Sequence, residues 1–298
     1  MLGAFLQNIK EQSYMRGLSD KFFECLKSGF LSGITESVKS DPDLNLEIRD
    51  SYINVYYKGN SLLKLSETGS SDYKAEIHEK FLEGINLSLD FSESTITQFL
   101  IAIPLLKQNI VRNGKRSLEV EYEQMIIRSN NFEPRNNTEY FIVDRQYVVK
   151  EGRFDLTGIF WEMSHRKRDQ EVPVCLMEIK FALNSDIKEV HDQLARYYES
   201  IKPHATEIAT EMQLVFRQKI ELGLYQQPAE RLNAIKTLSF SKSIDKFQFI
   251  LVLVDYNPNS SKLDLQSFSS LPFANQVKVF FSGFGMWQQN VKPLSSLL

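Results

Sequence analysis

The sequence predicts an α/β protein: a central mixed sheet flanked by helices, preceded by an N-terminal α+β extension. Two observations lead to this class. After Asn113-Gly114 the chain reads as a helix, three extended runs and a second helix, which is the pattern of a compact α/β unit. Further on, the run KFQFILVLVDY (residues 246–256) is apolar almost throughout, as expected of a strand covered on both faces.

Composition sets the size and the class of the protein. The chain has 298 residues, of which 42% are hydrophobic and 24% charged, so it can bury a large core. We divide it into an N-terminal helical and hairpin module, residues 1–112, and a C-terminal domain, residues 113–298. Cys25 and Cys175 are far apart in sequence, which argues against a disulfide framework and for a reducing, cytoplasmic location.

Partners are only partly constrained by these numbers. The longest apolar runs, FLIAIPLL and FILVLV, are too short to span a bilayer, so no membrane partner is expected. The net charge of −3 neither indicates nor excludes a nucleic-acid partner, because a local basic surface is sufficient for binding. The four histidines show no metal-ligand spacing, which argues against a zinc site.

The N-terminal elements are predicted from periodicity and turn residues. Apolar residues recur every three to four positions between Leu2 and Val38, which favours one or two amphipathic helices. The runs SYINVYY and SLLKL are separated by Lys58-Gly59-Asn60 and predict a hairpin. The polar stretch SETGSSD is the most linker-like loop, and residues 94–114 read as a helix kinked at Pro104.

The C-terminal elements follow from the same patterns. Helices are predicted for LEVEYEQMIIRS, SDIKEVHDQLARYYESI and TEIATEMQLVFRQKIEL, and strands for YFIVDRQYVV, RFDLTGIFW and VPVCLMEIKFA. The run QVKVFFSGFGMW is either a late strand or the beginning of a helix.

The run CLMEIKFA (residues 175–182) carries two charges inside an apolar strand. Side chains alternate along a strand, so Glu178 and Lys180 share one face with Val174 and Leu176. A charged pair at a strand end is the ordinary explanation. Asp155, in the preceding strong strand RFDLTGIFW, strengthens the functional one, because an aspartate and a glutamate from neighbouring strands suit Mg²⁺, which binds few carboxylates and keeps waters. Lys180 can then steady the attacking water or the charge that develops on a phosphate.

Two helices can add side chains to this edge of the sheet. Gln193 lies beside the predicted apolar stripe of the helix that follows Lys180, although packing alone also explains such a position. That stripe consists of Ile187, Val190, Leu194, Tyr197 and Ile201. In the helix before the sheet, a buried face of Leu118, Tyr122, Met125 and Ile126 places Glu119 and Glu121 on its borders and turns Glu123 outward.

Glu121, Asp155, Glu178-x-Lys180 and Gln193-x-x-x-Tyr197, in this order, resemble the PD-(D/E)xK nuclease superfamily, which has the restriction-endonuclease-like fold. The resemblance covers about residues 115–202. It implies a magnesium-dependent nuclease acting on DNA, with Mn²⁺ as a substitute metal. Its metal ligands would be Asp155, Glu178 and Glu121, with Lys180 and Gln193 completing the catalytic site. Phe154 stands where the literal motif has proline, and Glu119 or Glu123 can replace Glu121 as the helix carboxylate.

Other readings stay open at this point. The same fold can be a catalytically silent nucleic-acid-binding or assembly module, or a plain α/β interaction protein whose charges form surface pairs. The basic segments NGKRS (residues 113–117) and HRKRD (residues 165–169) either contact phosphates or are solvated turns. The N-terminal module matches no motif and is a candidate substrate-reading or partner-binding unit of a defence or mobile-element nuclease. DNA against RNA, sequence specificity, endo- against exonuclease action and oligomeric state remain open.

Overall fold

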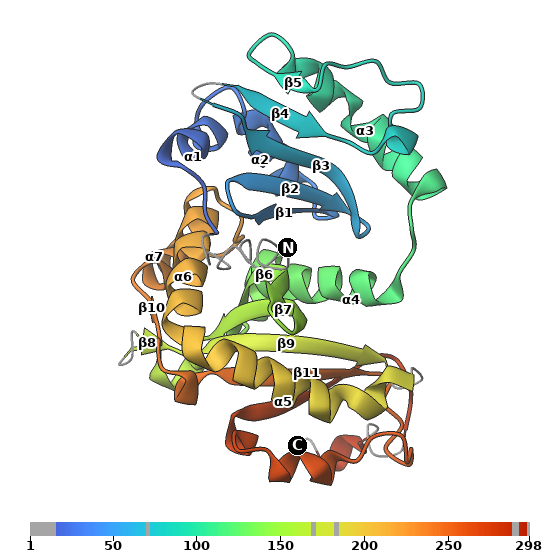
Figure 1. The fold of residues 1–298 in the computed structure, drawn as a ribbon, viewed down its shortest axis with the longest axis vertical. Helices are drawn as coiled ribbons and strands as arrows, with labels where there is room; N and C mark the ends of the chain where they lie inside the picture. The colour runs from blue at the N-terminus through green and yellow to red at the C-terminus, as the bar shows by residue number, and fades with distance from the viewer. Residues whose placement is uncertain (1–15, 70–71, 168–170, 182–184, 288–291, 297–298) are drawn as a thin grey trace, which may run out of the picture.

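The fold was obtained as a computed structural model, which describes residues 16–69, 72–167, 171–181, 185–287 and 292–296. Two five-stranded sheets stand one above the other along the long axis (Figure 1). The upper sheet belongs to the N-terminal module and the lower one to the C-terminal domain. The predicted α/β class with a mixed sheet between helices is therefore confirmed in its coarse form.

The N-terminal module is an antiparallel sheet in the order β1-β2-β3-β4-β5 with three helices. Its helices are α1 (Asp20–Lys27), α2 (Ser32–Ser40) and α3 (Ile96–Asn113), and its strands are β1 (Leu44–Ile48), β2 (Tyr52–Tyr57), β3 (Asn60–Glu67), β4 (Tyr73–Glu76) and β5 (Asp90–Phe91). The helix predicted from Leu2 onward falls partly on residues 1–15, outside the described residues. Ser19 is the N-cap residue of α1, and its hydroxyl accepts a hydrogen bond from the Phe22 backbone N–H.

The predicted hairpin is confirmed, and its turn has a clear physical basis. β2 and β3 pair antiparallel, and Lys58 and Gly59 both take positive φ, at 45° and 74°. Such angles are needed in the tight turns that match the twist of the strands. The polar stretch SETGSSD does not separate two units, because its first two residues belong to β3, which pairs antiparallel with β4 from Tyr73 onward; its residues 70 and 71 lie outside the described residues.

The C-terminal domain is built on a mixed sheet in the order β12-β11-β9-β7-β6. Its strands are β6 (Tyr140–Val149), β7 (Gly152–Phe160), β9 (Val174–Phe181), β11 (Gln248–Val254) and β12 (Val277–Ser282), and a separate two-stranded sheet holds β8 (Glu171–Val172) and β10 (Ser239–Phe240). β6, β7 and β9 pair antiparallel, whereas β9, β11 and β12 run parallel. The run QVKVFFSGFGMW, for which the sequence left a strand and a helix as alternatives, contains a strand, β12.

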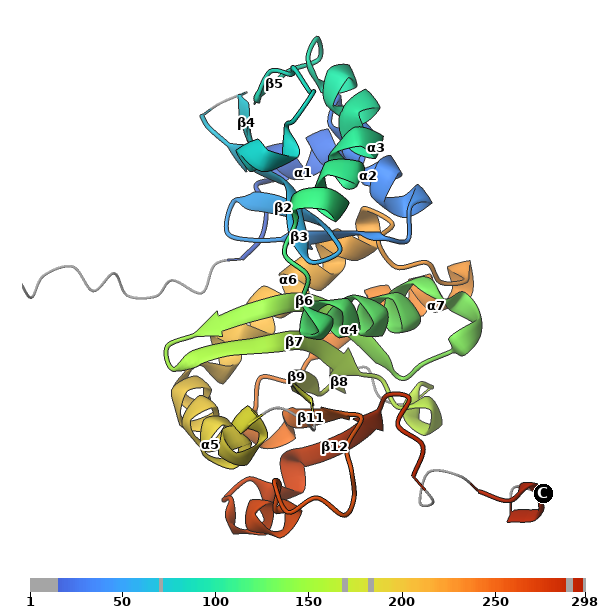
Figure 2. The same cartoon turned by 90° about the vertical axis from the view of Figure 1, so that its right-hand side faces the viewer.

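Helices cover the two faces of this sheet unequally. The helices are α4 (Leu118–Ile127), α5 (Val190–Ile201), α6 (Ala205–Glu221) and α7 (Ala229–Lys236). α5 and α6 lie on one face and α4 on the other (Figure 2). β9 shows the predicted alternation, since Val174 and Leu176 join one hydrophobic cluster while Cys175, Met177 and Ile179 join another. The predicted apolar stripe of α5 is buried as expected.

The two modules share their core. One hydrophobic cluster contains residues from both sides of the boundary predicted after residue 112. Buried ion pairs also cross it, because Lys219 on α6 donates to Glu47 on β1 over 2.6 Å and Arg49 pairs with Asp144 on β6. The N-terminal module is therefore packed against the C-terminal domain through charged groups as well as apolar ones.

Two further sequence expectations concern cysteines and membranes. Cys25 and Cys175 are both free thiols, as predicted. Within the described residues, no helix combines the length and the apolar character that crossing a bilayer demands.

Candidate active site

Asp155 lies where β7 and β9 separate. The paired residues run from Ile159 opposite Val174 to Leu156 opposite Met177. One position further, Asp155 Oδ2 accepts a hydrogen bond of 2.7 Å from the Ile179 backbone N–H. The carboxylate thus accepts the hydrogen bond of a strand N–H that would otherwise donate to a carbonyl oxygen of the neighbouring strand. This arrangement places a buried carboxylate at the opening between two strands.

Glu178 is the centre of the group. It is only 3% exposed, and its Oε1 accepts hydrogen bonds of 2.7 Å from both Lys180 Nζ and Gln193 Nε2. Its second oxygen, Oε2, is buried and has no hydrogen-bond partner. Leaving a buried carboxylate oxygen without a partner is costly, so this atom has an unused capacity to bind a donor or a cation.

Gln193 is held in one orientation by Tyr197, one helical turn later on α5. Gln193 Nε2 also donates to Tyr197 Oη over 2.9 Å, and that hydroxyl accepts from the Arg153 backbone N–H and donates to its C=O. The sequence predicted Tyr197 as part of the apolar stripe of this helix and noted its spacing from Gln193, but did not predict these hydrogen bonds. The structure shows that Tyr197 fastens α5 to the beginning of β7, close to Asp155.

The electrostatics of the group reflect two carboxylates in a dry place. Burial raises the pKa of Asp155 to about 8, with the negative charge of Glu178 adding to the effect and the Ile179 N–H opposing it. Burial also raises the pKa of Glu178, although Lys180 and Gln193 counteract it. Burial alone would lower the pKa of Lys180, but the charge and hydrogen bond of Glu178 outweigh it and the pKa is raised. At neutral pH, Lys180 is therefore a charged ammonium, and it lies beside a pair of acidic groups of which Asp155 retains its proton.

Glu121, the helix carboxylate chosen from the sequence, and Glu119 are both exposed. The α4 charges that raise the pKa of Asp155 are those of Glu119 and Glu123. Glu119 also raises the pKa of Glu178 and of Lys180. Of the two exposed carboxylates, Glu119 is thus the one whose charge acts on the site.

The rotation of α4 explains the difference. The predicted buried face is only partly confirmed. Tyr122 and Ile126 are half-buried and pack against the core. Leu118, however, is 66% and Met125 47% exposed, and Glu123 is buried instead. Glu123 pairs over 2.5 Å with Arg145 on β6, which has no exposed surface at all. A buried guanidinium requires an anion, and this requirement turns the helix. An apolar pattern could not reveal it, since Arg145 looks like an outward strand residue.

The residues present fit a divalent cation. Asp155 and Glu178 supply oxygen ligands on neighbouring strands, and Glu178 Oε2 is a buried oxygen without a partner. Mg²⁺ typically takes one or two carboxylates and keeps several waters, so a larger cage is unnecessary. In the described part of the chain, no group of three or more His, Cys, Asp or Glu side chains forms a metal cage. The site thus resembles an open cation site and not a closed structural one.

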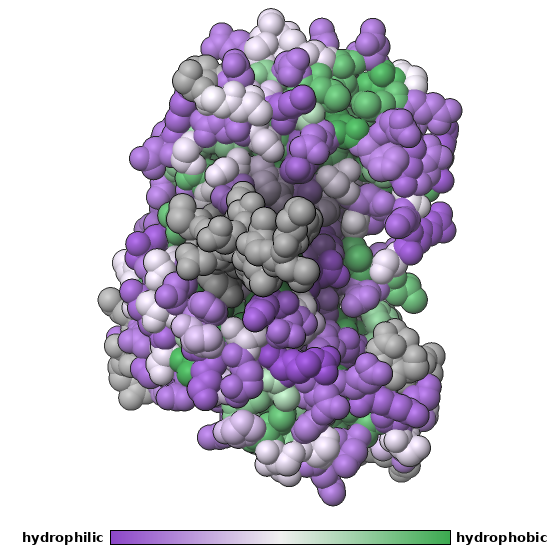
Figure 3. All heavy atoms as spheres, viewed as in Figure 1, coloured by the Kyte–Doolittle hydropathy of each residue, from purple (hydrophilic) through white to green (hydrophobic). Residues whose placement is uncertain are grey.

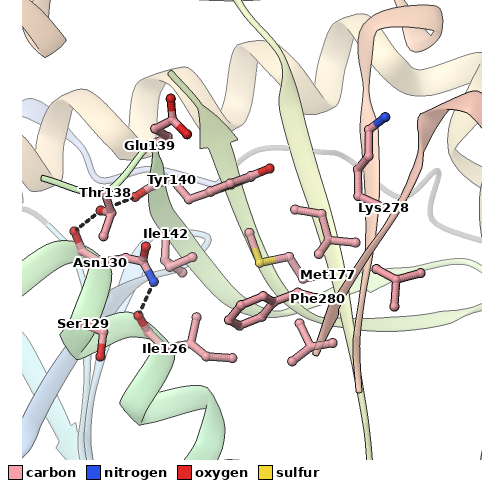
Figure 4. A pocket seen from close by; sticks show the side chains of 13 residues that line it. Ile126, Ser129, Asn130, Thr138, Glu139, Tyr140, Ile142, Met177, Lys278 and Phe280 are labelled. Carbon is pink, nitrogen blue, oxygen red and sulfur yellow. Dashed lines mark hydrogen bonds between the residues drawn. The ribbon is translucent and has the colours of Figure 1, made fainter. Parts of the chain in front are cut away.

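An apolar pocket lies elsewhere. A pocket of about 500 Å³ opens on the other face of the sheet between α4 and β12. It is lined by apolar side chains such as Met177 and Phe280, with Tyr140 and Lys278 at its rim (Figure 4). None of the acidic or basic residues at the junction of β7 and β9 lines it. The pocket and the charged group are therefore separate features.

Comparisons of the chain with family models, with curated proteins and with solved structures gave no match. The chemistry of the site must therefore be argued from its own geometry.

Proposed function

We propose that the protein is a metal-dependent nuclease that hydrolyses phosphodiester bonds, with DNA as the main substrate. The observation that carries the proposal is the Glu178 carboxylate. One of its oxygens is held by Lys180 and Gln193 while the other is buried without a partner, next to Asp155. The buried oxygen without a partner is an available ligand for a cation. A cation site uses the free oxygen.

The arrangement of elements supports the same proposal. A helix, three antiparallel strands, a second helix and a parallel strand (α4, β6, β7, β9, α5 and β11) occur in this order, with β8 inserted before β9 and with α6, α7 and β10 inserted before β11. This order resembles the restriction-endonuclease-like core of the PD-(D/E)xK superfamily. The free cysteines suit a reducing compartment such as the cytoplasm.

Each residue then has a distinct task. Asp155 and Glu178 hold the cation, and Glu119 is the α4 carboxylate whose charge acts on both of them. A bound Mg²⁺ would lower the pKa of a water ligand and stabilise negative charge on the phosphate. Lys180 keeps an ammonium where charge develops, and Gln193 fixes the orientation of Glu178 through the hydrogen bond described above.

The test is cleavage by purified protein of a panel of single- and double-stranded DNA and RNA with Mg²⁺ or Mn²⁺. We expect cutting that chelator abolishes and that Glu178→Gln reduces by at least about 10²-fold, the usual scale for one preorganised electrostatic group. Lys242→Ala, an exposed lysine beside β10, is the matched surface control. Nucleic-acid binding without any metal-stimulated cutting would instead support the catalytically silent module.

A further inference from the structure

Three exposed cations border the α4 end of the site. Lys58 lies in the β2–β3 turn, and Lys115 and Arg116 lie in the connector between α3 and α4. We call Lys58, Lys115 and Arg116 the basic wall. Within the described residues, none of the three forms a salt bridge with a carboxylate, although the Lys58 ammonium lies over the Tyr57 ring, 5.8 Å from its centroid. Their charge is therefore not neutralised by an acid and is available to an anionic partner.

The basic wall is assembled by one asparagine. Asn60 Oδ1 accepts from the Lys115 backbone N–H over 3.0 Å, and Asn60 Nδ2 donates to the carbonyl oxygens of Lys115 and Lys58, both over 3.0 Å. Gly59 lies so close to Val120 on α4 that a Cβ atom would collide with its methyl group. The N-terminal hairpin turn is thus fixed to the connector and to the first turn of α4.

The basic wall is close to the proposed chemistry. Arg116 precedes Glu119 by three residues, so their Cα atoms are at most about 11 Å apart. On the same helix as Glu119, the Tyr122 ring packs edge-on against Phe181, which directly follows Lys180 on β9, with the ring centroids 5.2 Å apart. The space-filling view shows a notch on the right-hand side between the upper and lower parts of the molecule, at the height of α4 and its connector (Figure 3). Figure 1 places the connector and the first turn of α4 above the carboxyl end of β9, so nucleic acid on this side of the molecule would meet both groups.

The second basic segment is in the wrong place for this role. HRKRD follows the end of β7 remote from Asp155, next to β8 on the left of Figure 1, and its residues 168 and 169 lie outside the described residues. Arg166 is occupied with structural contacts, since it donates to Asn137 and Thr138 and stacks on Trp161. Of the two basic segments, NGKRS is the one beside the site.

We propose that the basic wall binds the phosphodiester backbone of the substrate close to the scissile bond. The inference rests on the proposed function and adds a role for the N-terminal module. That module becomes part of the nucleic-acid-binding surface through its β2–β3 turn, while α4 connects the turn to the metal ligands.

The test measures the salt dependence of binding to a labelled 20-base-pair DNA duplex in chelator, so that cleavage does not interfere. Each phosphate contact contributes about 0.9 to the slope of log affinity against log salt. Replacing all three wall residues by alanine should lower the slope by about 2 to 3. Between about 50 and 200 mM salt, wild type should therefore lose about 40-fold more affinity than the variant.

Two controls separate charge near the site from charge in general. A charge-conserving variant (Lys58→Arg, Lys115→Arg, Arg116→Lys) should keep the wild-type slope, which also shows that the fold tolerates changes there. A remote variant removes three exposed lysines on the β8 and β10 side, and it should leave the slope unchanged: Lys167→Ala, Lys236→Ala and Lys242→Ala. Thermal melts confirm that each variant is folded.

The outcomes distinguish this inference from the proposed function. If wild type cuts DNA with Mg²⁺ but the alanine variant keeps the wild-type slope, the basic wall is not a phosphate contact and the nuclease proposal stands. An equal loss of slope in the remote variant would contradict the inference in the same way. If wild type neither binds nor cuts any member of the DNA and RNA panel, both proposals are overturned.

Discussion

Asp155→Asn should make the metal-free protein more stable while abolishing its activity. The fold raises the pKa of Asp155 from its ordinary value of 3.8 to about 8, so at pH 7 it retains a proton that the unfolded chain releases. One pKa unit is worth about 1.4 kcal/mol, which gives a cost of at most about 4 kcal/mol at this pH. An asparagine oxygen can still accept the Ile179 N–H without carrying a charge.

The measurable gain is smaller, because the amide also loses hydration on burial. We expect the free energy of unfolding to rise by about 1 to 3 kcal/mol, or the melting temperature by about 2 to 10 °C. Because the fold raises the pKa of Asp155, the contribution of its carboxyl group to stability is fully present at a pH below 3.8, the ordinary pKa. That contribution is lost as the pH rises from there towards about 8. The advantage of the variant should therefore grow from pH 6 to pH 8, by up to about 2.7 kcal/mol.

Thermal and urea denaturation in chelator at both pH values measure this difference, with the exposed Asp245→Asn as the control. Added Mg²⁺ should raise the melting temperature of wild type. At a Mg²⁺ concentration of a hundred times the dissociation constant, the free energy of unfolding should increase by about 2.7 kcal/mol, and the variant should gain much less. The assignment of Asp155 as a buried carboxyl group with a raised pKa would be refuted by either of two results. One is a variant that is less stable than wild type in chelator at pH 8, and the other is a stability difference that does not change with pH.

Three other substitutions test separate parts of the structure. Lys180→Ala should lower cleavage by at least about 10²-fold while calorimetry still detects cation binding, because both carboxylates remain; unchanged turnover would assign Lys180 to structure. Glu47→Gln should cost about 3 to 5 kcal/mol at pH 7 by leaving the Lys219 ammonium buried without its anion. Burial would raise the pKa of Glu47, but Lys219 and Arg49 lower it overall, so this cost should shrink only as the pH falls well below 4.5, and a cost that does not vary with pH would contradict the pairing. Gly59→Ala should destabilise the protein by about 1 to 3 kcal/mol, through its positive φ and the collision with α4; an unchanged melting temperature would show that the turn is not fixed there.

The strand patterns were readable from the sequence because their signals are local. Alternation along β9 predicted which side chains share a face, and the apolar stripe of α5 predicted which of its faces is buried. The position of Gln193 beside that stripe was sufficient to suggest contact with the charged pair, and it does donate to Glu178. These features depend on the period of a strand or a helix, which a few neighbouring residues determine.

The rotation of α4 and the role of each basic segment were decided only by the tertiary structure. Arg145 on β6 must pair with an acid once it is buried, and that distant contact buries Glu123 and exposes Leu118. As a result, Glu119 and Glu123 are the α4 charges that raise the pKa of Asp155. A sequence determines the faces of its own segments, because side-chain direction repeats along the backbone. Which segment meets which depends on where charges lose their water, and that cost arises only when the segments pack together.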